Sequence, residues 1–470
     1  MNRVAQLALT ALPAIVLLGM LFMGRYLSAY LSSQMYLAGL VFLLVLLLCL
    51  WFYDRLYFPL LMIAFLWAGM RVPMSEAWTA GRWVVLGAGA FVGIMRTLGT
   101  SLKRYSAFHL AAFAAVSTAL ISAMASSAPQ FSLLKALSLF LLFLYGAAGA
   151  RVVLKNPDRF FRGLLLACEI SMYGSVICYL LLGREIWGNR NSLGAVEGVI
   201  AAPLLLWGAL IANDKTLRLR RGIACVGALF LVCFTITRAA MLASGLSILL
   251  LLVGLRRYRL IVQGAFGIAC IVAVTAIVAP NRFDDTKESL VSGVIYKGHE
   301  EQGLLGSRLS PWQETVHTIQ QNPYFGSGFG TSMSGDSPFG GGGRFASSSA
   351  VREHGSSYLA IAEYVGLLGI VPFVVLILLL AHAIIRVLLW VRRTGSACHY
   401  AVPLMLVLVA GLVHAGFEDW MFAVGYYLTI LFWTFAFLMM DILPAPPVHD
   451  APVVHRVPYP YQAGLAASRQ

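Results

Sequence analysis

Residues 35–53 read "MYLAGLVFLLVLLLCLWFY", a run without a single charged side chain. A helix needs about 20 mostly apolar residues to cross the hydrocarbon core of a bilayer, so this run predicts a membrane-spanning helix. The whole chain shares this character, because 60% of its 470 residues are hydrophobic and only 11% are charged. Soluble domains carry about 25% charged residues. The sequence therefore predicts an all-α polytopic membrane protein.

Similar apolar runs recur along the chain, and we expect about 12–14 transmembrane helices. The runs cover residues 4–24, 35–53, 56–70, 83–95, 107–124, 131–150, 163–183, 193–212, 222–236, 239–255, 259–279, 357–385, 400–416 and 421–443. The first run is too long for a typical cleaved signal sequence, so we interpret it as an uncleaved helix.

The spacing of the runs divides the chain into four segments. Residues 1–279 hold the first eleven predicted helices, 280–356 form one long loop, 357–443 hold the last three helices, and 444–470 form a tail. The loop contains a predicted short amphipathic helix over 311–320 and a Gly/Ser-rich stretch over 326–350, whose composition predicts flexibility. The proline-rich tail is expected to be disordered.

Basic residues fix the orientation. When the predicted spans alternate, the short basic loops "RVVLKNPDRFFR" (151–162), "NDKTLRLRR" (213–221), "LRRYR" (255–259) and "RVLLWVRR" (386–393) fall on one side. The positive-inside rule makes this side cytoplasmic, together with both termini, and leaves the long loop outside. The net charge of +14 then reflects topology, and no nucleic-acid partner is expected. The seven cysteines lack metal-ligand spacing, so neither a metal site nor a disulfide framework is predicted.

Several arginines remain on the outer side, where the orientation rule does not explain them. They are Arg190, Arg238, Arg308, Arg344 and Arg352. Arg238, in "FTITRAAMLASG", stands between two spans, where a charge is either functional or an interfacial arginine that reaches water. Outward helix starts lie at "NRNSLG", "TRAA" and "GSSYLA". Because helix N-termini and arginine side chains both bind phosphate, these starts would form an anion site if they converge.

Four stretches give the chain a family resemblance. They are "GNRNSLG" (188–194), "TRAA" (237–240), "SRLSPWQETVHTIQQNPYFGSGFG" (307–330) and "EHGSSYLAIAEYVGLLG" (353–369). Together they resemble the O-antigen ligase/polymerase superfamily of bacterial membrane glycosyltransferases. The resemblance implies a multi-pass inner-membrane protein with a periplasmic active site. It also implies an undecaprenyl-pyrophosphate-linked glycan as donor, a glycan or lipid A-core as acceptor, surrounding membrane lipid, and no metal or nucleotide cofactor.

The resemblance also assigns residues. It implies that Arg238 and Arg308 contact the pyrophosphate and that His354 is either the base or the residue that positions the acceptor. Substrate contacts are expected from Arg190, Asn191, Trp312, Arg352, Ser356 and Glu363. A neutral histidine near pH 7 suits proton abstraction from a sugar hydroxyl. One departure stands out, because Gly355 occupies the position that the family register gives to the histidine. Either one residue is inserted at this junction, or His354 is not equivalent.

Three functions stay open at this stage. Polymerisation of O-antigen or exopolysaccharide is favoured, with ligation of glycan to lipid A-core or to protein as the alternative. A flippase or transporter is the rival class, because Glu169, Glu197 and Glu363 lie in apolar runs and such carboxylates can form ion paths. The stretch "HAGFEDWMF" (414–422) places Glu418 and Asp419 near the outer face, in contact with the acceptor or in a structural role.

Overall fold

The computed structural model describes residues 3–26, 33–70, 75–98, 106–182, 187, 190–266, 273, 306–331 and 354–444. Every regular element named within these ranges is a helix, which confirms the all-α prediction. The first half contains α1 (Arg3–Tyr26), α3 (Gln34–Gly69), α4 (Ser75–Leu98), α5 (Ala107–Met124), α6 (Pro129–Val153), α7 (Pro157–Leu182), α8 (Arg190–Ala195), the π-helix η1 (Val196–Ala201) and α9 (Ala202–Ile211). The second half contains α10 (Lys215–Phe234), α11 (Arg238–Gly254), α14 (Gly306–Gln321), α15 (Ser357–Gly369), α16 (Val371–Thr394), α17 (Ala401–Ala415) and α18 (Tyr427–Asp441).

The helices have the length and composition of a polytopic membrane protein. Six are long and apolar enough to cross a bilayer: Tyr36–Trp67, Ala107–Met124, Pro129–Val153, Pro157–Tyr179, Arg190–Ile211 and Val371–Thr394. Shorter apolar helices cover Leu9–Met23, Arg238–Gly254, Ser357–Gly369, Ala401–Ala415 and Tyr427–Asp441. The predicted run 259–279 and the tail 444–470 lie largely outside the described residues, so the total of about 12–14 spans stays a prediction.

Some predicted boundaries change. The runs 35–53 and 56–70 are the two arms of α3, which has non-helical backbone at Phe52 (φ −121°, ψ 19°). Just after this kink, Asp54 forms ion pairs of 3.0 Å with Arg96 and with Lys155. The three residues come from α3, from α4 and from the turn just after α6. The run 357–385 is likewise divided, because α15 ends at Gly369 and α16 starts at Val371.

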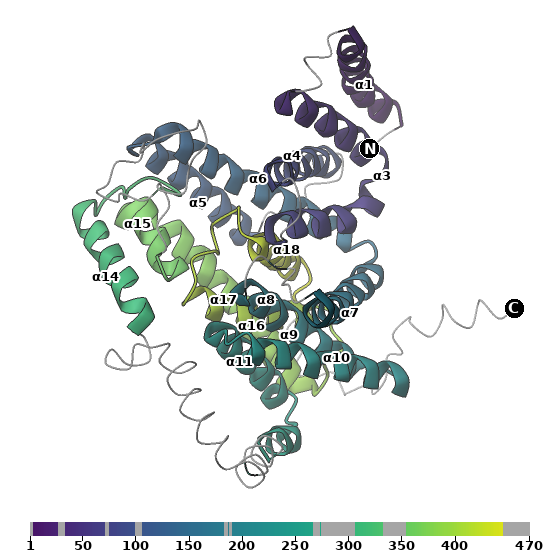
Figure 1. The fold of residues 1–470 in the computed structure, drawn as a ribbon, viewed down its shortest axis with the longest axis vertical. Helices are drawn as coiled ribbons and strands as arrows, with labels where there is room; N and C mark the ends of the chain where they lie inside the picture. The colour runs from purple at the N-terminus through teal and green to yellow at the C-terminus, as the bar shows by residue number, and fades with distance from the viewer. Residues whose placement is uncertain are drawn as a thin grey trace, which may run out of the picture.

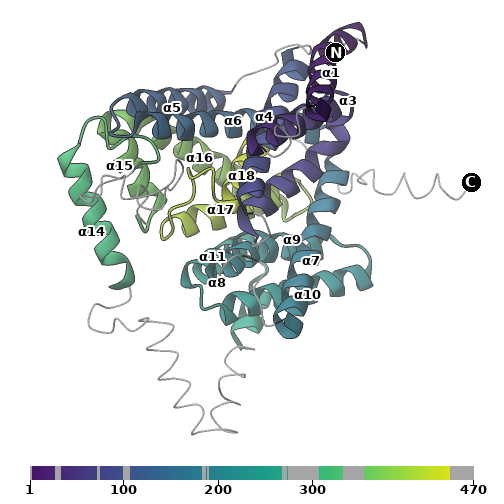
Figure 2. The same cartoon turned by 45° about the horizontal axis from the view of Figure 1, so that its top comes forward.

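The last two helices form the centre of the molecule. Figures 1 and 2 show α17 and α18 between α5 and α6 on one side and α7 to α11 on the other. Nearly all residues of α17 and α18 are buried, as expected for helices that are apolar all round. The loop between them, residues 416–426, carries Glu418 and Asp419. Packing of the two helices therefore holds this acidic loop in a fixed position.

The described part of the Gly/Ser-rich stretch is packed, so the prediction of flexibility is wrong for residues 326–331. The N–H of Ser327 donates to the Glu363 carbonyl at 2.8 Å, and the N–H of Leu367 donates to the Pro323 carbonyl at 2.7 Å. Gly326 (φ +74°) and Gly366 (φ +66°) make this crossing possible, because a Cβ on either would stand within 2.4 Å of a backbone oxygen. The glycines serve a close backbone approach here. Residues 332–350 lie outside the described residues.

Candidate functional site

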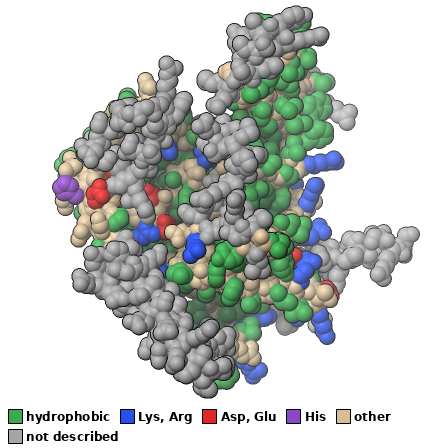
Figure 3. Space-filling view, in the orientation of Figure 1, with side chains coloured by type: hydrophobic (Ala, Val, Ile, Leu, Met, Phe, Trp, Pro, Cys, Tyr) green, Lys and Arg blue, Asp and Glu red, His purple; other side chains and the backbone are tan. Residues whose placement is uncertain are grey.

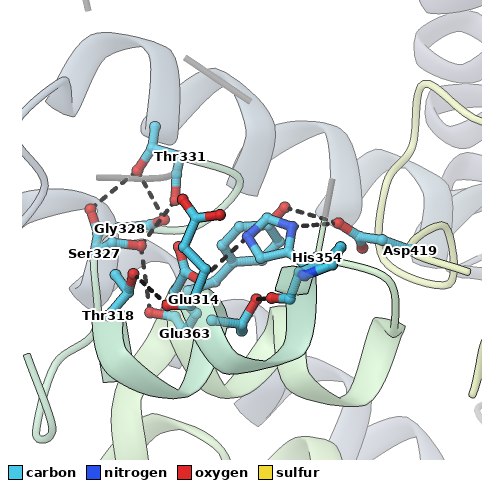
Figure 4. Close-up of polar contacts among 11 residues, drawn as sticks. Glu314, Thr318, Ser327, Gly328, Thr331, His354, Glu363 and Asp419 are labelled. Atoms are coloured by element: carbon cyan, nitrogen blue, oxygen red, sulfur yellow. Dashed lines mark hydrogen bonds and ion pairs between the residues drawn. The ribbon is translucent and has the colours of Figure 1, made fainter. Parts of the chain in front are cut away.

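His354 lies just before α15 and is held between two carboxylates. Its Nδ1 donates to Asp419 Oδ2 at 2.6 Å, and its Nε2 is 3.4 Å from Glu363 Oε2 (Figure 4). The imidazole has no exposed surface. The Tyr364 ring packs edge-to-face against it with centroids 5.0 Å apart, and the Tyr364 hydroxyl lies 3.5 Å from Asp419 Oδ2. The ring is therefore fixed in position and orientation by residues of α15 and of the α17–α18 loop.

The carboxylates change the protonation of His354. Burial lowers the pKa of this imidazole, but hydrogen bonds and charge interactions with Asp419 and Glu363 outweigh burial and raise it to about 9. At pH 7 the ligand-free site therefore holds an imidazolium, which differs from the neutral histidine expected from the sequence. The imidazole can accept a proton from another group only after it has lost this one.

Gly355 connects His354 to the start of α15. It has a left-handed backbone (φ +67°), and its carbonyl accepts a hydrogen bond of 3.1 Å from Trp312 Nε1. Trp312 therefore fastens α14 to the junction. Ser356 is buried at the N-cap position of α15, although its hydroxyl forms no cap hydrogen bond. Gly355 is thus the residue at which the chain turns between His354, which points into the site, and the start of α15. The two alternatives for the register of His354 stay predictions.

Ser357, which the sequence analysis did not single out, fixes the acidic loop. Its hydroxyl donates to the Glu418 carbonyl at 2.7 Å and accepts from the N–H groups of Trp420 and Met421 at 2.9 and 3.0 Å. These three bonds tie the first turn of α15 to both sides of Asp419. The partner of His354 is thus held by a residue three positions along the chain from His354 itself.

Arg308 and Arg238 lie together beside this loop. Helix α14 begins at Gly306, so the predicted start of this helix at residue 311 is wrong and Arg308 belongs to its first turn. Arg308 Nη2 forms an ion pair with Glu418 Oε1. Arg238 starts α11, is partly exposed, and lies close enough to Arg308 for the two positive charges to interact. Two neighbouring guanidinium groups favour an anion between them.

The starts of α8 and α11, two of the three whose convergence an anion site would require, lie against each other. A Cβ on Gly194 of α8 would stand 2.4 Å from the Thr237 hydroxyl oxygen, at the N-cap of α11. Arg190 and Asn191 are exposed at the start of α8. Arg352, the remaining predicted contact, lies outside the described residues, as does Arg344.

Two further cations belong to this region and were not predicted. The ammonium of Lys135, on α6, interacts electrostatically with Arg82 and with Asp419. Arg82, on α4, donates to the Gly425 carbonyl in the α17–α18 loop at 2.9 Å. Lys135 stands alone in an apolar run, and a charge at such a position is itself a signal of function. In the described ranges no cluster of three or more His, Cys, Asp or Glu has the arrangement of a metal site.

The fold and this site define a polytopic membrane protein with a buried histidine between carboxylates and a surrounding group of cations. Residues 223–374, which contain Arg238, Arg308 and His354, match the family model described as O-Antigen ligase. The match confirms the resemblance to the O-antigen ligase/polymerase superfamily over these residues, and it supports a glycosyltransferase-like activity in general. No curated protein matches the chain.

Proposed function

We propose that the protein polymerises or transfers an undecaprenyl-pyrophosphate-linked glycan at the periplasmic face of the bacterial inner membrane. One observation carries the proposal. Adjacent residues of the α17–α18 loop, Glu418 and Asp419, hold Arg308 and His354 respectively, and both of the residues that are held lie within the matched range 223–374. A group suited to stabilising an anionic leaving group and a group suited to proton transfer are thereby joined in one site.

The chemistry that this arrangement suits is a single displacement. The acceptor hydroxyl oxygen attacks the anomeric carbon of the donor sugar, and the bond from that carbon to the pyrophosphate oxygen breaks. The lipid pyrophosphate leaves with the electron pair, next to Arg238 and Arg308. Electrostatic stabilisation of such developing charge is commonly the largest contribution to catalysis. The hydroxyl proton passes to His354 in its neutral form, and Asp419 stabilises the imidazolium that results.

Polymerisation is our preferred reading, and ligation to lipid A-core or to protein is the alternative. Both use the same donor chemistry and differ in the acceptor. Deletion of the gene separates them through the surface polysaccharide of the cells. We expect loss of long chains while a single repeat stays attached; loss of all attached glycan would instead identify a ligase.

A lipid-linked glycan flippase is the rival class. The carboxylate of Glu169, one of its candidate ion-path residues, forms ion pairs with Arg220 at 3.0 Å and Arg221 at 3.5 Å, which is a sufficient structural role. The discriminating experiment uses purified protein with a polyprenyl-pyrophosphate glycan in EDTA. We expect a new glycosidic bond and released polyprenyl pyrophosphate. Movement of the lipid across a vesicle bilayer without any lengthened glycan would overturn the proposal.

A further inference from the structure

Arg82 is a buried cation, and one of its N–H donors has no acceptor among the described residues. Only 7% of the residue is exposed. Its Nη1 donates to the Gly425 carbonyl, and its Cζ lies 5.7 Å from the centroid of the Trp83 ring. Its Nε is buried and has no hydrogen-bond partner in the described part of the chain. Within the described residues no carboxylate pairs with this guanidinium. Burial of an unpaired charge is costly, so an anion that completes the site would bind favourably.

Lys135 is a second cation, which interacts electrostatically both with Arg82 and with Asp419 of the acidic loop. Its side chain packs against Gly330, where a Cβ would stand 2.9 Å from Lys135 Cγ, so the glycine makes room for the lysine. The Nζ lies 5.2 Å from the centroid of the Phe131 ring. The charges that act on Lys135 are those of Arg82 and Asp419. Asp419 already accepts the hydrogen bond from His354. Its single negative charge therefore does not neutralise Arg82 and Lys135 as well.

The two pairs of cations approach the α17–α18 loop from different helices. Arg238 and Arg308 come from α11 and α14, and Arg308 pairs with Glu418. Arg82 and Lys135 come from α4 and α6, and they approach Gly425 and Asp419. Figure 3 shows Lys and Arg side chains gathered at the centre of this face with acidic side chains between them.

We propose that Arg82 and Lys135 form a second anion subsite, which binds a phosphate group of the acceptor glycolipid. The inference rests on the proposed function and deepens it. It places His354 and Asp419 between a donor pyrophosphate at Arg238 and Arg308 and an acceptor phosphate at Arg82 and Lys135. A glycan that is itself linked to a lipid pyrophosphate supplies such an acceptor, and this is the substrate of a polymerase.

Binding tests the subsite without any need for turnover. The probe is a short prenyl methylenebisphosphonate, added to the full-length protein in detergent and counted by native mass spectrometry. Wild type is expected to bind two equivalents, and the double variant Arg82→Gln/Lys135→Gln one. Arg238→Gln/Arg308→Gln is expected to bind the other one. Free methylenediphosphonate, used in parallel, shows whether the anion alone is sufficient or the lipid is required. A single equivalent on wild type, or two on the double variant, would overturn the subsite.

Transfer tests the assignment to the acceptor. Two acceptors with the same glycan are compared, one linked to a polyprenyl pyrophosphate and the other to a phosphate-free alkyl chain. The double variant is expected to raise KM at least about tenfold for the phosphate-bearing acceptor, with little change for the phosphate-free one or for the donor. A changed donor KM, or equal losses on both acceptors, contradicts the assignment.

Two controls separate this outcome from misfolding and from failure of the proposed function. Lys135→Arg keeps the charge and should keep the KM of the phosphate-bearing acceptor within about threefold, and the exposed Arg392→Gln should behave as wild type. No transfer by wild type with either acceptor would remove the proposed function, while the binding stoichiometry would still decide whether the subsite exists.

Discussion

His354 is fully buried and lies between the carboxylates of Glu363 and Asp419. We expect His354→Ala to lower kcat/KM for glycan transfer at least about 100-fold, equivalent to about 3 kcal/mol of transition-state stabilisation. The matched control is His317→Ala, an exposed histidine on α14 that should retain full activity. Activity of His354→Ala within tenfold of wild type would mean that His354 is not the equivalent of the family histidine.

The protonation of His354 predicts a pH dependence. Its pKa is raised to about 9, so the neutral form that accepts a proton is scarce at pH 7 and grows about tenfold per pH unit towards pH 9. We expect log kcat/KM to rise with pH and level off near pH 9. Asp419→Asn removes the carboxylate at Nδ1, so it should lower the pKa of His354 and move the rise to lower pH. A flat profile between pH 6 and 9 would assign His354 to positioning of the acceptor.

Arg238 and Arg308 differ in their surroundings but should both be required. Arg308 is oriented by Glu418, whereas Arg238 stands at the start of α11 near a like charge. We expect Arg238→Ala and Arg308→Ala to abolish transfer while the protein still inserts and accumulates. Arg308→Lys should not restore activity, because lysine lacks the planar fork that binds a phosphate through two hydrogen bonds. Transfer within tenfold of wild type would exclude the altered arginine from the chemistry.

At the scale of elements, the local sequence pattern predicted where helices begin and end, but it did not predict which residues far apart in the chain are in contact. The run 107–124 coincides with α5, and the run 239–255 lies within one residue of α11, because each has a polar residue at its start and an uninterrupted apolar body. The hydrogen bond between His354 and Asp419 joins residues 65 positions apart, and periodicity carries no information on such pairs. Lys135 was not predicted for the same reason, since Arg82 and the α17–α18 loop, with which it interacts, lie far from it along the chain.

Glycine content alone does not tell whether a glycine belongs to a flexible segment or to a tight contact between two backbones. Gly and Ser are common in flexible linkers, yet Gly326 and Gly366 are used for a crossing of two backbones. The crossing ties the end of the α14 segment to the helix that carries Glu363. A motif with fixed glycine spacing was therefore a better guide to structure than the glycine content of the surrounding stretch.

The crossing of the two backbones predicts that adding one methyl group at Gly366 destabilises the protein. Gly366 has φ +66° and ψ 179°, a conformation almost confined to glycine, and a Cβ would stand 2.4 Å from the Tyr324 carbonyl oxygen. We expect Gly366→Ala to lower the free energy of unfolding by about 2 kcal/mol or more and to reduce transfer. Gly245→Ala is the matched control, because it lies in helix α11 with no atom within 4 Å of the new Cβ. Thermal unfolding in detergent measures the stability of the two variants. Equal melting temperatures of Gly366→Ala and Gly245→Ala would show that the turn is not held by this crossing.

On the scale of the whole molecule, the site joins segments that the predicted topology places on one side of the membrane. His354 precedes α15, Asp419 lies between α17 and α18, and Arg238 starts α11. Alternation of the predicted spans puts all three at the outer ends of their helices. In that topology the run 357–385, which forms α15 and part of α16, is one crossing, and the run 400–416, which contains α17, is a second. His354 and Asp419 are therefore predicted on the same side of the membrane, in agreement with their hydrogen bond.

Orientation gives the last prediction. Tyr324, in the turn beside α15, has 64% of its side chain exposed, and Cys398 is exposed in the loop between α16 and α17. By the positive-inside rule, the basic loop at 386–393 predicts that Cys398 lies in the cytoplasm and Tyr324 outside. A charged maleimide cannot cross the membrane, so in intact spheroplasts it should label a Tyr324→Cys variant at position 324 and leave Cys398 unmodified. Detergent permeabilisation should then expose Cys398, with each site followed by peptide mass spectrometry. Labelling of Cys398 in intact spheroplasts, with protection of position 324, would reverse the orientation and place His354 on the cytoplasmic side.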